Sequence, residues 1–221
     1  MSSGTVSIPL DIVVARYTED VSWIDDLKAV HPRVWLYNKG GDLPGRPCMS
    51  IDNIGREAHT YLYHIITRWD DLADRTIFCQ AGTADHAPAF VDDVLLYGIN
   101  PKVEPFKPFG RNVRNQGVRL VRDDLNGQPH NGTVLPIESY CERFGIELDS
   151  RFVYFAPGAC FAVTRKAIKS PPRSFYESLI NDITSLPGRS QPWILERIWS
   201  NIFNKKVLDK NRTSDTLLAD N

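Results

Sequence analysis

The chain has 221 residues, of which 42% are apolar and 24% charged, with a formal net charge of -1. This length predicts one domain with a full core, and the near-zero charge argues against a nucleic-acid partner. No apolar run approaches the roughly 20 residues that span a bilayer, and the first residues lack the basic region of a signal peptide. We therefore expect a cytoplasmic protein with no transmembrane segment.

The first third of the chain alternates between strand and helix patterns. Residues 10–16, LDIVVAR, form a short apolar run typical of a buried strand, and residues 33–37, RVWLY, indicate a second one. Residues 19–30 between them predict a helix. Its apolar side consists of Val21, Ile24, Leu27 and Val30. A strand, a helix and a strand in this order predict a right-handed βαβ unit.

The strongest helical pattern lies at residues 53–69, where apolar residues recur at intervals of three and four. Asp52 or Asn53 is suited to cap this helix. Its polar side carries Arg56, Glu57, Thr60 and His64. Residues 75–80, RTIFCQ, follow as a third apolar strand.

The second half of the chain is less regular. Residues 100–135 are rich in Pro, Gly, Asn and Arg and predict little regular structure apart from a strand at GVRLV. Residues 152–164 read as two strand-like pieces that Pro157 and Gly158 interrupt.

Two helical patterns close the chain, at residues 173–185 and 191–203, before a polar tail at residues 209–221. The order of elements predicts an α/β fold with one mixed, mostly parallel sheet flanked by helices. We expect a single domain at residues 1–208.

The turn after the third strand, AGTADHAP, is a candidate site, because ligands of open α/β sheets bind beyond the carboxyl ends of the strands. Asp85 there is a possible ligand of Mg²⁺ or Mn²⁺, with His86 beside it. Alternatively, Asp85 is a turn residue that caps a helix starting near Pro88.

Two further charged residues stand at informative positions. Arg16 ends the first strand, where arginine can clamp a phosphate, although an ion pair with Glu19 or Asp20 would also explain it. Glu196 adjoins the apolar stripe of the last helix. It is either a general base that faces a cleft or a solvated helical glutamate.

Six sequence blocks occur in order between about residues 12 and 203. They are VVARYTEDVSW, YNKG, NIGREAHTYLYHII, IFCQAG, PGACFAVTR and ERIWSNIF. Together they resemble the DUF3431 family, which we associate with glycosyltransferase-like proteins. The resemblance implies a GT-A-like, nucleotide-diphospho-sugar transferase fold. Such folds commonly carry a D-x-D metal motif after a mid-domain strand, whereas this chain has AGTAD after TIFCQ.

The resemblance also implies roles for particular residues. The donor nucleotide, diphosphate and sugar would contact Ala15, Arg16, Tyr17, Asn38, Lys39, Arg56, Gln80, Gly158 and Ala159. Glu196 would deprotonate the acceptor hydroxyl, and Asp85 with His86 would hold a divalent cation, Mn²⁺ or Mg²⁺.

The function implied is transfer of a sugar from a nucleoside diphosphate sugar, with a UDP-sugar as the expected donor, to a glycan, glycoprotein or other hydroxyl acceptor. Two alternatives stay open at this point. One is a non-catalytic module of the same fold that binds nucleotide or carbohydrate. The other is a hydrolase that uses the same donor with water as the acceptor.

Overall fold

A computed structural model describes residues 9–100, 102, 104–110, 118–121, 129–130, 133–148, 152–186 and 190–204. Its centre is a six-stranded sheet with the strand order β3-β2-β1-β4-β10-β5. The strands are β1 (Leu10–Arg16), β2 (Arg33–Asn38), β3 (Met49–Ser50), β4 (Arg75–Gln80), β5 (Phe106–Pro108) and β10 (Phe161–Thr164). The three strands predicted in the first third of the chain therefore form the middle of the sheet.

Parallel pairing joins β3, β2, β1 and β4, whereas β10 runs antiparallel to both β4 and β5. The mixed, mostly parallel sheet predicted from the sequence is confirmed. The two strand-like pieces at residues 152–164 belong to different sheets, because β9 (Phe152–Phe155) pairs with β6 (Val118–Val121) instead of β10. A third pair consists of β7 (Pro129–His130) and β8 (Thr133–Val134).

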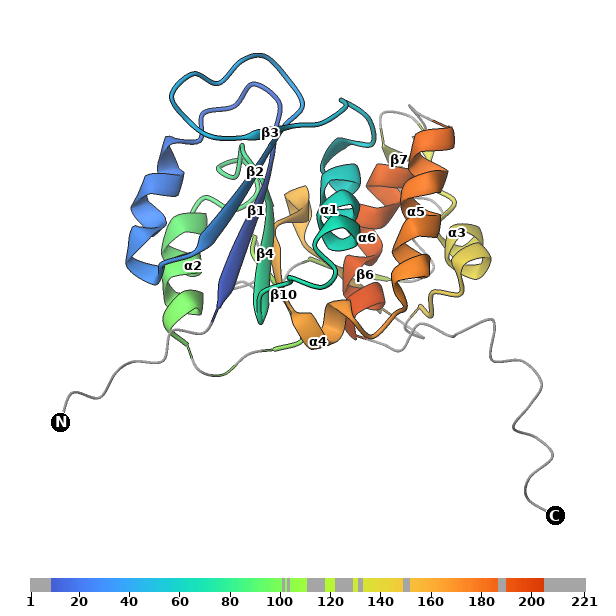
Figure 1. The fold of residues 1–221 in the computed structure, drawn as a ribbon. Coiled ribbons are helices and arrows are strands. Elements are labelled where there is room, and N and C mark those ends of the chain that lie inside the picture. The colour runs from blue at the N-terminus through green and yellow to red at the C-terminus, as the bar shows by residue number, and fades with distance from the viewer. Residues whose placement is uncertain are drawn as a thin grey trace.

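Helices cover both faces of the large sheet (Figure 1). One face packs against η1 (Ser22–Val30) and α2 (Phe90–Ile99), and the other against α1 (Arg56–Thr67), α5 (Arg173–Ser185) and α6 (Gln191–Asn204). The side chains of β1 alternate between the two faces of the sheet. Ile12 and Val14 lie in the hydrophobic core on the first face, and Val13 lies in the core on the second. Burial on both faces explains why the middle of the strand, residues 12–15, is a continuous apolar run.

The predicted helix at residues 19–30 is a 3-10 helix, η1. The apolar residues Val21, Ile24 and Leu27 are buried and recur every third residue. This spacing matches the three residues per turn of a 3-10 helix, in which side chains three apart align along one side.

Helix α1 starts later than the sequence predicted and is buried on more sides. Its N-cap is Gly55, with φ 60°, and no side chain caps it, so the predicted cap at Asp52 or Asn53 is wrong. The polar side of the predicted helix is also buried at Glu57 and His64. The physical reason is that α1 contacts β1 and β4 as well as α5 and α6.

Two helices were missed in the sequence, α3 (Ile137–Phe144) and α4 (Arg165–Ile168). α3 ends at Gly145, whose φ of 65° is the left-handed conformation that glycine favours at helix ends. The predicted tail at residues 209–221 lies outside the described residues. Within the described part, no helix is long and apolar enough to cross a membrane.

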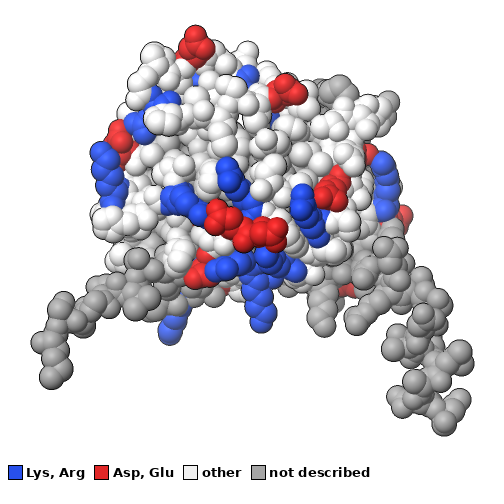
Figure 2. Space-filling model, in the orientation of Figure 1, with Lys and Arg blue, Asp and Glu red and all other residues white. Residues whose placement is uncertain are grey.

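Acidic and basic side chains are interspersed on the face shown in Figure 2. At the amino end of the sheet, Asp11 binds the guanidinium of Arg33, which also pairs with Asp71. Asp11 is fully buried, whereas Arg33 and Asp71 are partly exposed. These ion pairs connect β1 and β2 to the loop between α1 and β4, at the end of the sheet opposite to the candidate site.

Candidate functional site

The strand order reverses direction between β1 and β4, because the chain first adds β2 and β3 on one side of β1 and later β4 on the other. In open α/β sheets, ligands bind in the crevice outside the carboxyl ends of the strands at such a point. A pocket of about 280 Å³ lies there. Its strand side is formed by Ala15, Arg16, Tyr17, Glu19 and Gln80.

The opposite side of this switch-point pocket comes from the residues around the start of α1. They are Lys39, Asn53, Arg56 and Glu57. The strand register explains the grouping, since Ala15 lies beside Gln80 on β4 and Arg16 lies beside Asn38 on β2. Residues predicted from distant blocks of the sequence therefore meet at one place.

Arg16 is buried, with 7% of its surface exposed. Its Nε donates to the carbonyl of Glu19, and its Nη1 donates to the Asn38 Oδ1 at 2.8 Å and to the carbonyls of Tyr17 and Gly41. The alternative considered for Arg16, an ion pair with Glu19 or Asp20, is not among the ion pairs of the described residues. The guanidinium instead holds together the two loops that follow β1 and β2.

Asn38 and Lys39 also shape the loop after β2. The Asn38 side chain donates to the Gly41 carbonyl at 2.9 Å. The Lys39 Nζ donates to the carbonyls of Ile54 and Arg56, at the start of α1. Burial lowers the pKa of Lys39 to about 8, against the opposing influence of nearby carboxylates. Lys39 therefore brings a positive charge to the pocket wall while fixing the entry of α1.

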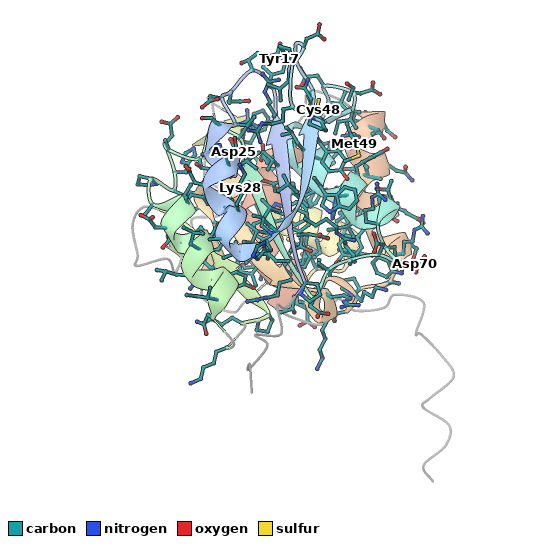
Figure 3. The ribbon with its side chains drawn as sticks, turned by 60° about the vertical axis from the view of Figure 1, so that its left-hand side comes forward. Tyr17, Asp25, Lys28, Cys48, Met49 and Asp70 are labelled. Carbon is teal, nitrogen blue, oxygen red and sulfur yellow. The ribbon has the colours of Figure 1, made fainter. Side chains whose placement is uncertain are left out.

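Arg56 and Tyr17 are exposed members of the pocket, as are Glu19 and Asn53. The Arg56 side chain is 52% exposed, and its guanidinium lies 5.5 Å from the ring of Trp193 on α6. Tyr17 is 51% exposed, and Figure 3 shows it at the end of the molecule opposite to Asp70. An exposed cation and an exposed aromatic ring at one pocket suit a ligand with both an anionic and a flat part.

Glu57 is the buried acid of the pocket, with 6% of its surface exposed. Its Oε2 lies 3.5 Å from the Nε of Arg56. Burial raises the pKa of Glu57 to about 7, and the negative charge of Glu196 adds to this effect. Sequence reasoning missed this residue, because the helical pattern placed it on a solvated side. Near Glu57 in the sequence, only the adjacent Arg56 was predicted to belong to the site.

The turn Pro157–Ala159, η3, lies next to the pocket and is held from three elements. The carbonyl of Gly158 accepts from Gln80 Nε2 at 2.8 Å, and the amide of Gly158 donates to Glu196 Oε1 at 2.8 Å. The Tyr61 hydroxyl donates to the carbonyl of Ala159 at 3.0 Å. Glu196 is thus neither a solvated helical glutamate nor free of partners.

The backbone of this turn is unusual. Gly158 and Ala159 both adopt positive φ, 70° and 51°. A Cβ on Gly158 would lie only 2.6 Å from a ring carbon of His86. The close packing requires glycine at this position. It also shows where the structure places His86, which packs on the turn and does not line the switch-point pocket.

Asp85 precedes His86 in an exposed turn and does not line the pocket either. No group of three or more His, Cys, Asp or Glu that could hold a metal ion occurs in the part of the chain that the structure describes. Asp85 also does not cap α2, whose N-cap is Ala89 without a side-chain bond. These two residues alone do not make a metal site, and we derive no step through a metal.

The fold and the pocket define a class of protein, a single-domain α/β protein with a polar ligand pocket at the switch point of its sheet. The family model described as "Protein of unknown function (DUF3431)" matches residues 12–96. This stretch runs from β1 into α2 and contains all the residues that line the pocket, but it excludes the turn at Gly158 and Glu196. Neither the curated proteins nor the solved structures contain a match.

Proposed function

We propose that the protein transfers a sugar from a nucleoside diphosphate sugar, with a UDP-sugar as the preferred donor, to a hydroxyl of a glycan or glycoprotein. A GT-A-like fold and a cytoplasmic location are parts of the same proposal. The observation that carries it is the switch-point pocket, where Arg16, Lys39 and Arg56 bring positive charge to the carboxyl ends of β1 and β4. A leaving diphosphate needs this kind of charge stabilisation.

The size of the pocket suggests that it would hold only one part of the donor. A volume of about 280 Å³ lies just below the usual range for small-molecule sites, about 300–1,000 Å³. A nucleoside diphosphate sugar would therefore fill the pocket with its diphosphate and extend beyond it. Tyr17 offers an exposed ring for the base, and the sugar would extend toward Gln80, which joins the pocket to the buried turn at Gly158 and Ala159.

The experiment is a thermal-shift comparison of UDP, GDP, ADP and CMP, each with Mn²⁺ and with a chelator. A ligand at about 100 times its dissociation constant adds roughly 2.7 kcal/mol to the free energy of unfolding. We expect UDP to give the largest shift. Equal shifts for all four nucleotides would remove the base preference, and no shift for any of them would contradict the proposal.

The same assay tests the role of the metal and of Asp85. If Mn²⁺ enlarges the UDP shift in the wild type but not in Asp85→Asn, a cation bound at Asp85 takes part after all. If the variant responds as the wild type does, Asp85 is only a turn residue. Incubation of the sugar nucleotide with and without an acceptor then separates the alternatives. Turnover in water alone indicates a hydrolase, and binding without any turnover indicates a non-catalytic module.

A further inference from the structure

The switch-point pocket contains one carboxyl that is buried and faces the ligand space, Glu57, and a second carboxyl lies behind it, Glu196. The two differ in what they already bind. Glu196 accepts the amide hydrogen of Gly158 through Oε1 and lies 3.5 Å from the Nη1 of Arg197 through Oε2. Because both of its oxygens face partners of the protein itself, Glu196 is poorly placed to exchange a proton with a ligand.

Glu57 has a different environment. Its cationic partner is the Nε of Arg56 at 3.5 Å, which is long for a charge-assisted hydrogen bond, typically about 2.7–2.9 Å. The Nζ of Lys39 is directed to the carbonyls of Ile54 and Arg56. The carboxyl therefore lies in the pocket wall without a tight ion pair. A buried carboxyl of this kind exchanges its proton near neutral pH, as a general base needs.

We propose that Glu57 is the acid–base residue of the switch-point pocket and that Glu196 is a positioning residue, which holds the turn at Gly158. The proposal rests on the function proposed above for the reaction itself. It replaces Glu196, the base expected from the sequence, with a residue that lines the pocket.

The chemistry balances with Glu57 as the base. The acceptor hydroxyl oxygen forms a bond to the anomeric carbon of the donor, and its proton passes to the Glu57 carboxylate. The bond from the anomeric carbon to the diphosphate oxygen breaks, and its electron pair leaves with the diphosphate. Arg56 and Lys39 offset the charge that develops there. Glu57 then returns its proton to water.

The charged groups around Glu57 come from several elements. Arg56 and Lys39 favour its carboxylate form, whereas Glu196 on α6 favours its protonated form. Arg16 and Glu19 lie across the pocket, and Glu19 is exposed. The neighbours Tyr61 and Cys160 stay uncharged near neutral pH, because burial raises the pKa of each. An anion that enters the pocket adds negative charge beside Glu57 and promotes proton uptake.

The first test measures that proton uptake and needs no turnover. Inorganic pyrophosphate is titrated calorimetrically at pH 7 in two buffers of different ionisation enthalpy, so that the heat difference counts the protons taken up. Glu57→Gln is compared with wild type and with Glu19→Gln, a matched change in the same pocket. We expect Glu57→Gln alone to lose up to about half a proton of uptake. Equal uptake in all three proteins, or no binding of pyrophosphate to wild type, overturns the proposal.

The second test uses the pH dependence of donor turnover. We expect Glu57→Gln to lower the rate by about 10²- to 10⁴-fold, and Glu57→Asp to restore part of it. The pH–rate profile of Glu196→Gln should keep the limb that reports the titration of Glu57. This limb should lie at lower pH, because loss of the negative charge of Glu196 lowers the pKa of Glu57. Loss of that limb in Glu196→Gln, with its retention in Glu57→Gln, would reverse the two roles. Proton uptake at Glu57 without turnover of any sugar nucleotide would contradict the transferase but leave Glu57 as the proton-exchanging group.

Discussion

Arg16 and Arg56 both lie at the pocket and differ in what their guanidinium groups already contact. Arg16 is buried and donates to three carbonyls and to Asn38. Arg56 is half exposed and lies near the ring of Trp193, and its one ion pair within the described residues is the long contact to Glu57. At the residue scale, the same side chain therefore has a structural role at one position and remains available to a ligand at the other.

This contrast gives a prediction for two variants. Arg56→Ala should leave the fold intact and weaken diphosphate binding by about 10- to 150-fold, which corresponds to the 1.5–3 kcal/mol of a hydrogen bond to a charged group. Arg16→Ala should lower the melting temperature, because the loops after β1 and β2 lose the buried guanidinium that joins them. Calorimetric titration of UDP and thermal unfolding measure the two effects. If Arg16→Ala melts like wild type and Arg56→Ala binds UDP normally, the roles assigned here are wrong.

At the scale of elements, a buried arginine joins β4 to the end of α2. Arg75 is 2% exposed, and its guanidinium donates to the carbonyls of Tyr97, Gly98 and Asn100. These carbonyls lie at the C-terminal end of α2, where a cation interacts favourably with the helix dipole. The contact fixes α2 against the amino end of the sheet, away from the pocket.

We expect Arg75→Met to lower the free energy of unfolding by on the order of 2–4 kcal/mol, because the helix end loses its donors. Arg75→Lys, which keeps the charge but not the fork of donors, should recover part of the loss. Urea denaturation measures both. The control is Arg173→Met, which removes a surface pair with Glu177 worth about 0.5 kcal/mol. An Arg75→Met variant no less stable than this control would contradict the role of Arg75.

At the scale of the whole molecule, three buried groups of the described residues have shifted pKa values that affect stability between about pH 4 and 7. Burial lowers the pKa of His59 and of His64 to about 4, whereas an unfolded histidine titrates near 6.5. Between these values the unfolded chain binds more protons, so each histidine makes stability fall as the pH falls. Glu57 has the opposite effect, because its pKa is raised to about 7 in the fold and the native state binds the extra proton.

Two histidines outweigh one carboxyl, so the free energy of unfolding should rise by about 1.4 kcal/mol per pH unit between pH 5 and 6. In His64→Gln, one histidine and Glu57 remain and should nearly cancel, which gives a flat profile. His64 is a suitable position because its Nδ1 lies 3.0 Å from the Tyr37 hydroxyl, and glutamine can keep a polar contact there. Urea denaturation across this range measures the slope. An equal slope in wild type and variant would show that His64 does not titrate as described.

The sequence by itself determined the centre of the sheet and the helices that cover it. The apolar runs at β1, β2 and β4 and the helical patterns at α5 and α6 were predicted close to their observed bounds. These elements are long or strongly apolar, so their local pattern suffices. The pocket residues Ala15, Arg16, Tyr17, Lys39, Arg56 and Gln80 were also predicted, although partly from a resemblance and not from their chemistry.

Only the tertiary structure decided which of these residues are available to a ligand. Arg16 and Glu196 carry the expected charges, yet both are occupied by other parts of the protein. The Arg16 guanidinium binds the loop after β2, and the Glu196 carboxylate binds the turn at Gly158. Glu57 has the pattern of a solvated helix position, but α1 lies between the sheet and two other helices and buries it. A sequence pattern describes one helix and the residues next to it in the chain. Burial and hydrogen-bond partners depend on segments up to about 140 residues apart, as Glu57 and Glu196 are, and only their packing brings these groups together.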